Sequence, residues 1–142
     1  MIRKLRRGES GFTLLELLVV LAIMGMLAAI IAPQVIKYLG SSKTATAKIQ
    51  IQNVMAALEL YRLDVGRYPT GQEGLQSLVT APPTAPNWNG PYLKKDSALK
   101  DPWGVPYIYQ IPGQHGEVDV FTLGQDQQPG GTGEAQDVGS WQ

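Results

Sequence analysis

The feature that most constrains this chain is an almost uninterrupted apolar run at residues 12–32. The run has 21 residues and a single charged side chain, Glu16. A helix of about 20 apolar residues spans the hydrocarbon core of a bilayer, and Leu, Met and Ala are good helix formers. We therefore predict a membrane-spanning helix. The run is long for an ordinary secretory signal, although the small residues Ala28 and Ala29 keep that interpretation open.

Basic side chains precede the apolar run. They are Arg3, Lys4, Arg6 and Arg7. Basic residues beside a span stay on the cytoplasmic side, so the C-terminal bulk of the chain is predicted to lie across the membrane. Of the 12 basic and 12 acidic residues, these four and Glu9 precede Gly11, so the rest of the chain is net acidic. A basic tail for nucleic acid is the weaker alternative, because no basic stripe follows.

Glu16 is the unusual residue of the run. A carboxylate inside a membrane span costs roughly 2.5 kcal/mol or more unless it is paired, so it indicates function by default. One interpretation is that Glu16 reaches the headgroups from about one turn inside the span. The other is that it pairs with a cation of another subunit. If the chain were cut before Phe12, the new α-amine would be such a cation.

The phrase Gly11-Phe12-Thr13-Leu14-Leu15-Glu16 resembles the cleavage and methylation signature of type IV pilins and type II secretion pseudopilins. The resemblance implies that a prepilin peptidase cleaves between Gly11 and Phe12 and methylates the new Phe12 amine. It also implies that Glu16 is the carboxylate used in subunit assembly. On this basis residues 1–11 are a cleaved leader, 12–33 a transmembrane and assembly helix, and 34–142 the head.

The chain after residue 33 retains helical character to about residue 65. Apolar side chains recur there at steps of three and four residues, which is typical of a helix with one buried face. They are Ile51, Val54, Met55, Leu58, Tyr61 and Val65. We expect this stripe to pack against the head's own sheet, and a groove for a partner is the alternative. Pro33 is expected to bend the helix, and Gly66 to cap its end.

The second half of the chain is predicted to form turns, a short helix and a small sheet. Thr70 and Glu73 have the spacing of a capping box, which predicts a short helix through Val79. Residues 107–111 and 118–123 alternate apolar and polar side chains, which predicts an antiparallel hairpin. A short third strand is expected near Tyr92. The predicted fold class is α+β, with a long N-terminal helix packed on a small antiparallel sheet.

The sequence offers no group of residues suited to catalysis. The chain has no cysteine and one histidine, His115. A single histidine cannot build a metal site or a triad, and Asp101 before Pro102 is predicted to form a turn. A nucleophile–base pair and a phosphate-binding loop are also missing from the sequence. We therefore do not expect an enzyme.

Several phrases of the head resemble the major pseudopilin of type II secretion systems. They are residues 61–64, 68–70, 72–78, 101–107, 123–126 and 137–141. The resemblance implies a structural subunit that polymerises through its N-terminal helix into a pseudopilus and drives protein export across the outer membrane. The implied location is the bacterial inner membrane, crossed once, with the head in the periplasm.

The same resemblance implies a set of partners. They are further copies of the chain, minor pseudopilins, the prepilin peptidase and the inner-membrane assembly platform, with no nucleic acid. The alternative is a type IV pilin of a surface fibre used in adhesion, motility or DNA uptake.

The residues 124–139, here called the C-terminal loop, combine acidic side chains with glycines. Oxygen-rich loops of this kind can bind Ca²⁺, which takes six to eight oxygen ligands; a solvated tail is the alternative from residue types alone. The pseudopilin resemblance implies one bound Ca²⁺ that stabilises the head. It implies side-chain ligation by Asp126 and Asp137, joined by the Leu123 carbonyl.

Three further residues are weaker candidates for the calcium ligand set. Gln128 and Thr132 could contribute backbone carbonyls. Members of the family that the chain resembles carry an acid next to the residue that matches Asp137, where this chain has Gln136, and Glu134 could compensate for that difference.

Overall fold

The structure is a computed structural model that describes residues 11–142. The predicted leader, apart from Gly11, lies outside the described residues. The elements, in chain order, are α1 (Leu14–Val65), η1 (Leu75–Leu78), η2 (Asp96–Leu99), β1 (Ile108–Gln110), β2 (Asp119–Thr122), η3 (Gly133–Ala135) and β3 (Val138–Gly139). Internal contacts divide the chain into two units that meet between Ile36 and Lys37. Each unit is described by itself.

The first unit consists mainly of the N-terminal part of α1. Within the described residues, α1 is the one helix long and apolar enough to cross a membrane, and the side chains of its most apolar window are exposed. Phe12 and Leu14 are both 81% exposed. The helix continues through Pro33 without interruption. The apolar run is therefore helical from Leu14 as predicted, and its large apolar side chains are exposed among the described residues.

The second unit is built around the C-terminal part of α1. Ile51, Val54, Leu58 and Tyr61 are at most 1% exposed, and their spacing places them on one helix face. They share a core with residues of the sheet, including Val120 and Val138. The predicted apolar stripe is thus buried in the head's own core.

The end of α1 also matches its prediction. The helix stops at Val65. Gly66 follows with a φ of +86°, and its N–H donates to the Arg62 carbonyl over 2.8 Å. This is the hydrogen bond expected of a glycine that ends a helix.

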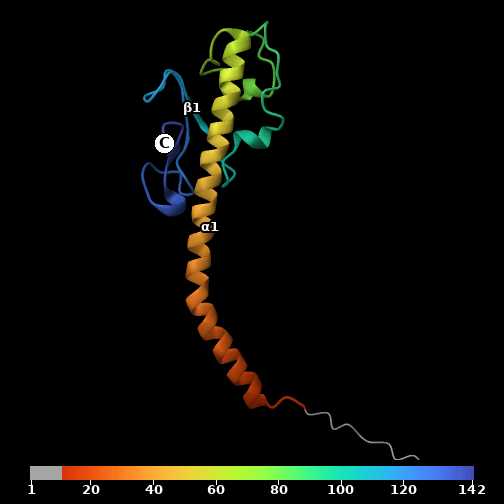
Figure 1. Cartoon of the computed structure of the whole chain (residues 1–142), viewed down its shortest axis with the longest axis vertical. Helices are drawn as coiled ribbons and strands as arrows, with labels where there is room; N and C mark the ends of the chain where they lie inside the picture. Colours follow the sequence, from red (N-terminus) through yellow and green to blue (C-terminus); the bar gives the residue numbers. More distant parts are fainter. Residues whose placement is uncertain (1–10) are drawn as a thin grey trace, which may run out of the picture. The chain divides into compact units, whose positions relative to one another are not determined.

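The sheet has three antiparallel strands in the order β1–β2–β3. Tyr109 of β1 pairs with Val120 of β2, and Thr122 of β2 pairs with Val138 of β3. Figure 1 shows β1 beside the part of α1 that lies in the second unit. The predicted fold, a long helix packed on a small antiparallel sheet, is confirmed, including its hairpin.

The expected third strand was misplaced. It is formed by residues 138–139, and the segment at Tyr92 and Leu93 is irregular. The N–H groups of Tyr92 and Leu93 both donate to the Leu78 carbonyl, over 2.8 and 3.1 Å. Because these two N–H groups donate to the last residue of η1, the segment at Tyr92 and Leu93 does not use them to pair with a strand.

The prediction of one short helix from Thr70 to Val79 was also wrong, because only residues 75–78 are helical and they form a 3₁₀ segment. Both hydrogen bonds of the capping box are present: Thr70 N–H donates to Glu73 Oε2 over 2.6 Å, and Glu73 N–H to Thr70 Oγ1 over 3.3 Å. However, Gly74 has a φ of +57°, which an α-helix does not allow. The chain therefore forms a turn and then the four-residue 3₁₀ segment η1.

Candidate functional site

The first candidate site lies at the N-terminus of α1. Glu16 N–H donates to Thr13 Oγ1 over 3.2 Å, and Thr13 N–H donates to Glu16 Oε2 over 3.0 Å. This reciprocal pair is a capping box, and it holds a carboxylate at the positive end of the helix dipole. The Thr-x-x-Glu spacing of residues 13–16 is the sequence signal of this capping box, which the charge of Glu16 alone does not reveal.

The Glu16 carboxylate remains open to other molecules. The side chain is exposed, and within residues 11–142 its hydrogen-bond partners belong to Thr13 alone. Gly11 and Phe12 are also exposed and precede the helix. A cation from another chain could therefore reach Glu16 without displacing an ion pair that involves residues 11–142.

The second candidate site is the C-terminal loop, whose two arms are connected by hydrogen bonds. Gln125 N–H donates to the Glu134 carbonyl over 2.8 Å. Gly130 N–H donates to Asp137 Oδ2 over 2.8 Å, and Gln128 N–H donates to Asp126 Oδ1 over 3.2 Å. The two predicted aspartate ligands thus stand on the two connected arms of the loop.

One oxygen of Asp137 fits a role as a metal ligand. Asp137 Oδ1 is a buried side-chain oxygen without a hydrogen-bond partner. Among residues 11–142, the Tyr61 hydroxyl is the only other buried side-chain atom without one. A buried carboxylate oxygen without a partner is costly. A hard cation would satisfy it, because Ca²⁺ prefers carboxylate and carbonyl oxygens. The predicted donors therefore fit the chemistry of this ion.

Side chains alone do not complete a metal site. Across residues 11–142, no group of three or more His, Cys, Asp or Glu side chains could hold a metal. Backbone carbonyls, of which Leu123, Gln128 and Thr132 are the predicted ones, would have to supply the other oxygens. Leu123 directly follows β2, so its position is set by the sheet.

The structure gives the Glu134 carboxylate partners outside the C-terminal loop. Glu134 Oε2 accepts a hydrogen bond from Trp103 Nε1 over 3.1 Å. The same oxygen lies 3.8 Å from Lys43 Nζ on α1. Glu134 is therefore not brought together with Asp126 and Asp137.

Asp101 forms a turn, as predicted. Its Oδ1 accepts N–H bonds from Trp103 over 3.0 Å and from Val105 over 2.8 Å. The Thr122 hydroxyl donates to Oδ2. Because the carboxylate is buried and fully used by these donors, it ties the turn to β2.

His115 has contacts that the sequence did not predict. Its Nδ1 lies 3.1 Å from Asp119 Oδ2, and its ring stacks on Trp141 with centroids 3.8 Å apart. Burial opposes ionisation of Asp119, but N–H donors from Gln114 and His115 outweigh it and lower the pKa of this carboxyl. The histidine thus secures the end of the chain near β2.

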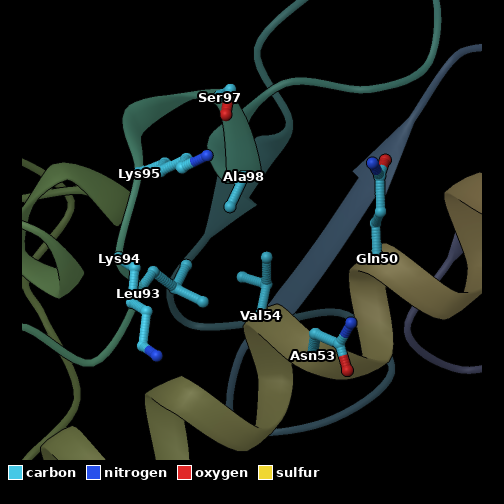
Figure 2. Close-up of a pocket in the computed structure, with 8 residues that line it drawn as sticks. All are labelled: Gln50, Asn53, Val54, Leu93, Lys94, Lys95, Ser97 and Ala98. Atoms are coloured by element: carbon cyan, nitrogen blue, oxygen red, sulfur yellow. The ribbon is translucent and has the colours of Figure 1, made fainter.

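A shallow cleft of about 380 Å³ lies between α1 and the segment around η2. Figure 2 shows side chains of α1 on one side and those of residues 93–95, 97 and 98 on the other. The lining residues are Gln50, Asn53, Val54, Leu93, Lys94, Lys95, Ser97 and Ala98. Ser97 provides the one hydroxyl of this lining, which contains no imidazole or carboxylate.

Comparison with known proteins defines the class. A model described as the prokaryotic N-terminal methylation motif matches residues 6–32. A second model, described as type II secretion system protein G, matches residues 34–141. An apolar N-terminal helix with this motif fits anchoring in the inner membrane, and the class is that of pilin-like subunits.

Individual relatives agree over nearly the whole chain. The type II secretion system core protein G of Pseudomonas aeruginosa is 45% identical over 140 residues, covering 96% of this chain and 97% of that protein. The Vibrio cholerae core protein G is 43% identical over 144 residues, covering 97% and 95% respectively.

A solved structure agrees as well. The crystal structure of the major pseudopilin from the type 2 secretion system of enterohaemorrhagic Escherichia coli matches with a TM-score of 0.60 and 32% identity. The match covers 70% of this chain and 87% of that one. The chain belongs to the type II secretion system protein G family, the major pseudopilins. This confirms the family predicted from the sequence and does not favour the surface-fibre alternative.

Proposed function

We propose that this chain polymerises through the N-terminal part of α1 into a pseudopilus that drives protein export across the outer membrane. The observation that carries the proposal is the exposed apolar N-terminal part of α1. In its first turn lies Glu16, whose hydrogen-bond partners within residues 11–142 belong to Thr13 alone. Apolar surface of this extent needs a cover. Lipid can supply it before assembly, and sister helices can supply it in the filament.

The proposed assembly contact is between Glu16 and the α-amine of Phe12 in a neighbouring copy. Cleavage between Gly11 and Phe12 by a prepilin peptidase creates that amine, and methylation keeps it basic. Pairing within a low-dielectric helix bundle offsets the cost of burying either charge alone. The head then lies in the periplasm, and the minor pseudopilins and the inner-membrane platform are the expected further partners. No catalytic step is assigned to the chain.

Complementation tests the proposed function. A Pseudomonas aeruginosa strain without its own core protein G would be given this chain, and secreted protein in the medium would be measured. We expect export to be restored, and mass spectrometry of the mature chain to give an N-methylated Phe12. A Gly11→Glu variant, which changes the proposed cleavage site and is expected to block processing, serves as the control at the same expression level. A mature chain that retains Met1 while supporting export would contradict the proposed pathway.

We also propose that the C-terminal loop binds one Ca²⁺. Asp126, Asp137 and the Leu123 carbonyl are the proposed ligands, with the Gln128 and Thr132 carbonyls as further ones. The unpartnered Asp137 Oδ1 supports this assignment. Bound metal stabilises the native state by mass action, which suits a head without disulfides.

Chelation tests the calcium proposal. Thermal unfolding of the full chain in detergent would be followed with Ca²⁺ and with excess chelator. We expect a lower Tm in chelator for the wild type, and a smaller difference for Asp137→Asn, which lacks the charge of one proposed ligand. Equal Tm values for the wild type under both conditions would contradict a stabilising calcium ion.

A further inference from the structure

The short element η3 in the C-terminal loop is attached to α1. Thr44 Oγ1 on α1 donates to the Gly133 carbonyl over 3.0 Å, and it also lies 3.2 Å from the Gly40 carbonyl one turn earlier. The hydroxyl is thus shared between the helix and the loop. Both partners belong to the second unit of the chain.

Gly40 allows the side chain of Glu134 to lie directly against α1. Gly40 is buried. A Cβ atom added there would be 2.6 Å from Glu134 Cγ and 3.0 Å from its Oε1. A side chain at residue 40 would therefore force the Glu134 side chain to shift, so glycine at this helix position permits the close contact.

The carboxylate of Glu134 is held by two further groups. Trp103 Nε1 donates to Oε2 over 3.1 Å, and Lys43 Nζ lies 3.8 Å away. The Glu134 side chain is 22% exposed and that of Lys43 is 45% exposed, so the indole hydrogen bond is the stronger constraint. Together with Gly40 and Thr44, these contacts hold Glu134 between α1 and the turn that contains Trp103.

The backbone of Glu134 is hydrogen bonded to the other arm of the C-terminal loop. Its carbonyl accepts the N–H of Gln125, the residue before Asp126, over 2.8 Å. Asp137 follows three positions after Glu134 in the chain. One residue therefore joins both aspartate arms of the loop to a fixed point on the helix.

We infer that Glu134 is a positioning residue that holds the C-terminal loop on α1, so that residues 40–44 of the helix set the loop's affinity for Ca²⁺. The inference rests on the proposed calcium function. It assigns Glu134 a role different from ligation, because its carboxylate is used by Trp103 and Lys43. Groups that orient metal ligands without touching the metal typically change metal affinity by 10- to 100-fold.

The test is calcium titration by calorimetry of the full chain in detergent. We expect Glu134→Ala to weaken binding about tenfold while one Ca²⁺ per chain is still bound. Glu134→Gln keeps an acceptor for Trp103 and should bind within about threefold of the wild type. Asp137→Asn, which removes a proposed ligand charge, should bind much more weakly than either. If Glu134 were itself a ligand, the Gln variant would lose affinity as severely as the Ala variant.

A second variant changes the contact from the helix side. Gly40→Ala alters no proposed ligand, and Ala is the better helix former, so a loss of affinity cannot come from a weaker α1. The matched control is Gly71→Ala, where an added Cβ meets nothing within 4 Å. We expect about tenfold weaker Ca²⁺ binding for Gly40→Ala and unchanged binding for the control.

Hydrogen exchange separates this role from a general loss of stability. In Gly40→Ala without calcium, amides of the C-terminal loop should exchange faster while those of β1 and β2 are unchanged. Wild-type affinity in both Glu134→Ala and Gly40→Ala, beside normal binding by the wild type, would overturn the positioning role alone. No Ca²⁺ binding by the wild type would overturn the calcium function together with this inference.

Discussion

Two regions of this molecule contain the same local motif, a threonine followed three residues later by a glutamate. At the start of α1, Thr13 and Glu16 exchange their two capping hydrogen bonds over 3.2 and 3.0 Å. After α1, Thr70 and Glu73 do the same over 3.3 and 2.6 Å. In both places the backbone and the threonine satisfy the carboxylate locally.

The two glutamates differ in what else they contact. Glu73 accepts two hydrogen bonds from Arg67, over 2.7 and 2.8 Å, and one from the Thr84 hydroxyl. Its side chain is only 8% exposed. Glu16 is exposed, and within residues 11–142 it bonds to Thr13 alone. In the head, the glutamate of this motif therefore has an arginine partner within the chain. At the start of α1, the glutamate is exposed, and a cation of a second chain can bind it.

The largest expected effect is at Glu16. Glu16→Ala should abolish filament assembly in cells while cleavage after Gly11 continues, because the proposed partner charge on a neighbouring Phe12 amine is left unpaired. Assembly would be measured by cross-linking and electron microscopy. The Tm of the head should be unchanged, and normal filaments from this variant would remove the assigned role of Glu16.

An intermediate effect is expected at Glu73, and it should depend on pH. Hydrogen bonds from Arg67 lower the pKa of the Glu73 carboxyl far below its ordinary value, although burial opposes the shift. Because the folded pKa lies below the unfolded one, the carboxylate stabilises the protein above about pH 4.3. That stabilisation is lost as pH falls toward the folded pKa.

Urea unfolding of the wild type and Glu73→Gln in detergent checks this expectation. At pH 7 the variant should lose about 2 kcal/mol in free energy of unfolding, and the difference should shrink below about pH 4. The control is Glu117→Gln, which removes an Arg62 partner whose side chain is 72% exposed. A difference between wild type and Glu73→Gln that did not vary with pH would contradict the lowered pKa.

The smallest effect is expected at Thr84. Thr84→Val removes one hydroxyl donor to Glu73 and keeps Arg67 in place, so a loss of about 1 kcal/mol is expected from the same urea unfolding at pH 7. Thr80→Val, at an exposed threonine, should change the free energy of unfolding very little. If Thr84→Val lost as much free energy of unfolding as Glu73→Gln, the Thr84 hydroxyl and not the Arg67 guanidinium would be the main partner that stabilises Glu73.

Sequence patterns predicted the parts of this fold that depend on neighbours along the chain. The long apolar run and the spacing from Ile51 to Tyr61 predicted α1 and its buried face, because helical periodicity repeats every few residues. Alternation at residues 107–111 and 118–123 predicted the hairpin for the same reason. The turn at Asp101 also followed from a local signal.

The parts that the sequence did not predict depend on distant partners. β3 has only two residues, which is too short for alternation to be visible. Glu134 meets Lys43 and Trp103 from positions 91 and 31 residues away in the chain. No spacing rule connects such residues, so the anchoring of the C-terminal loop to α1 could be found only from the structure.

The hydrogen bond between Trp103 and Glu134 makes the fluorescence of the Trp103 indole sensitive to the position of the C-terminal loop. The emission of an indole responds to the charge and solvent around its N–H, and here that group faces the carboxylate that joins the loop to the helix. Trp88 donates its own N–H to the Ser77 carbonyl at another place. The chain has three tryptophans, so a variant with phenylalanine in place of Trp88 and Trp141 would be needed for the fluorescence of Trp103 to follow the loop without an added label.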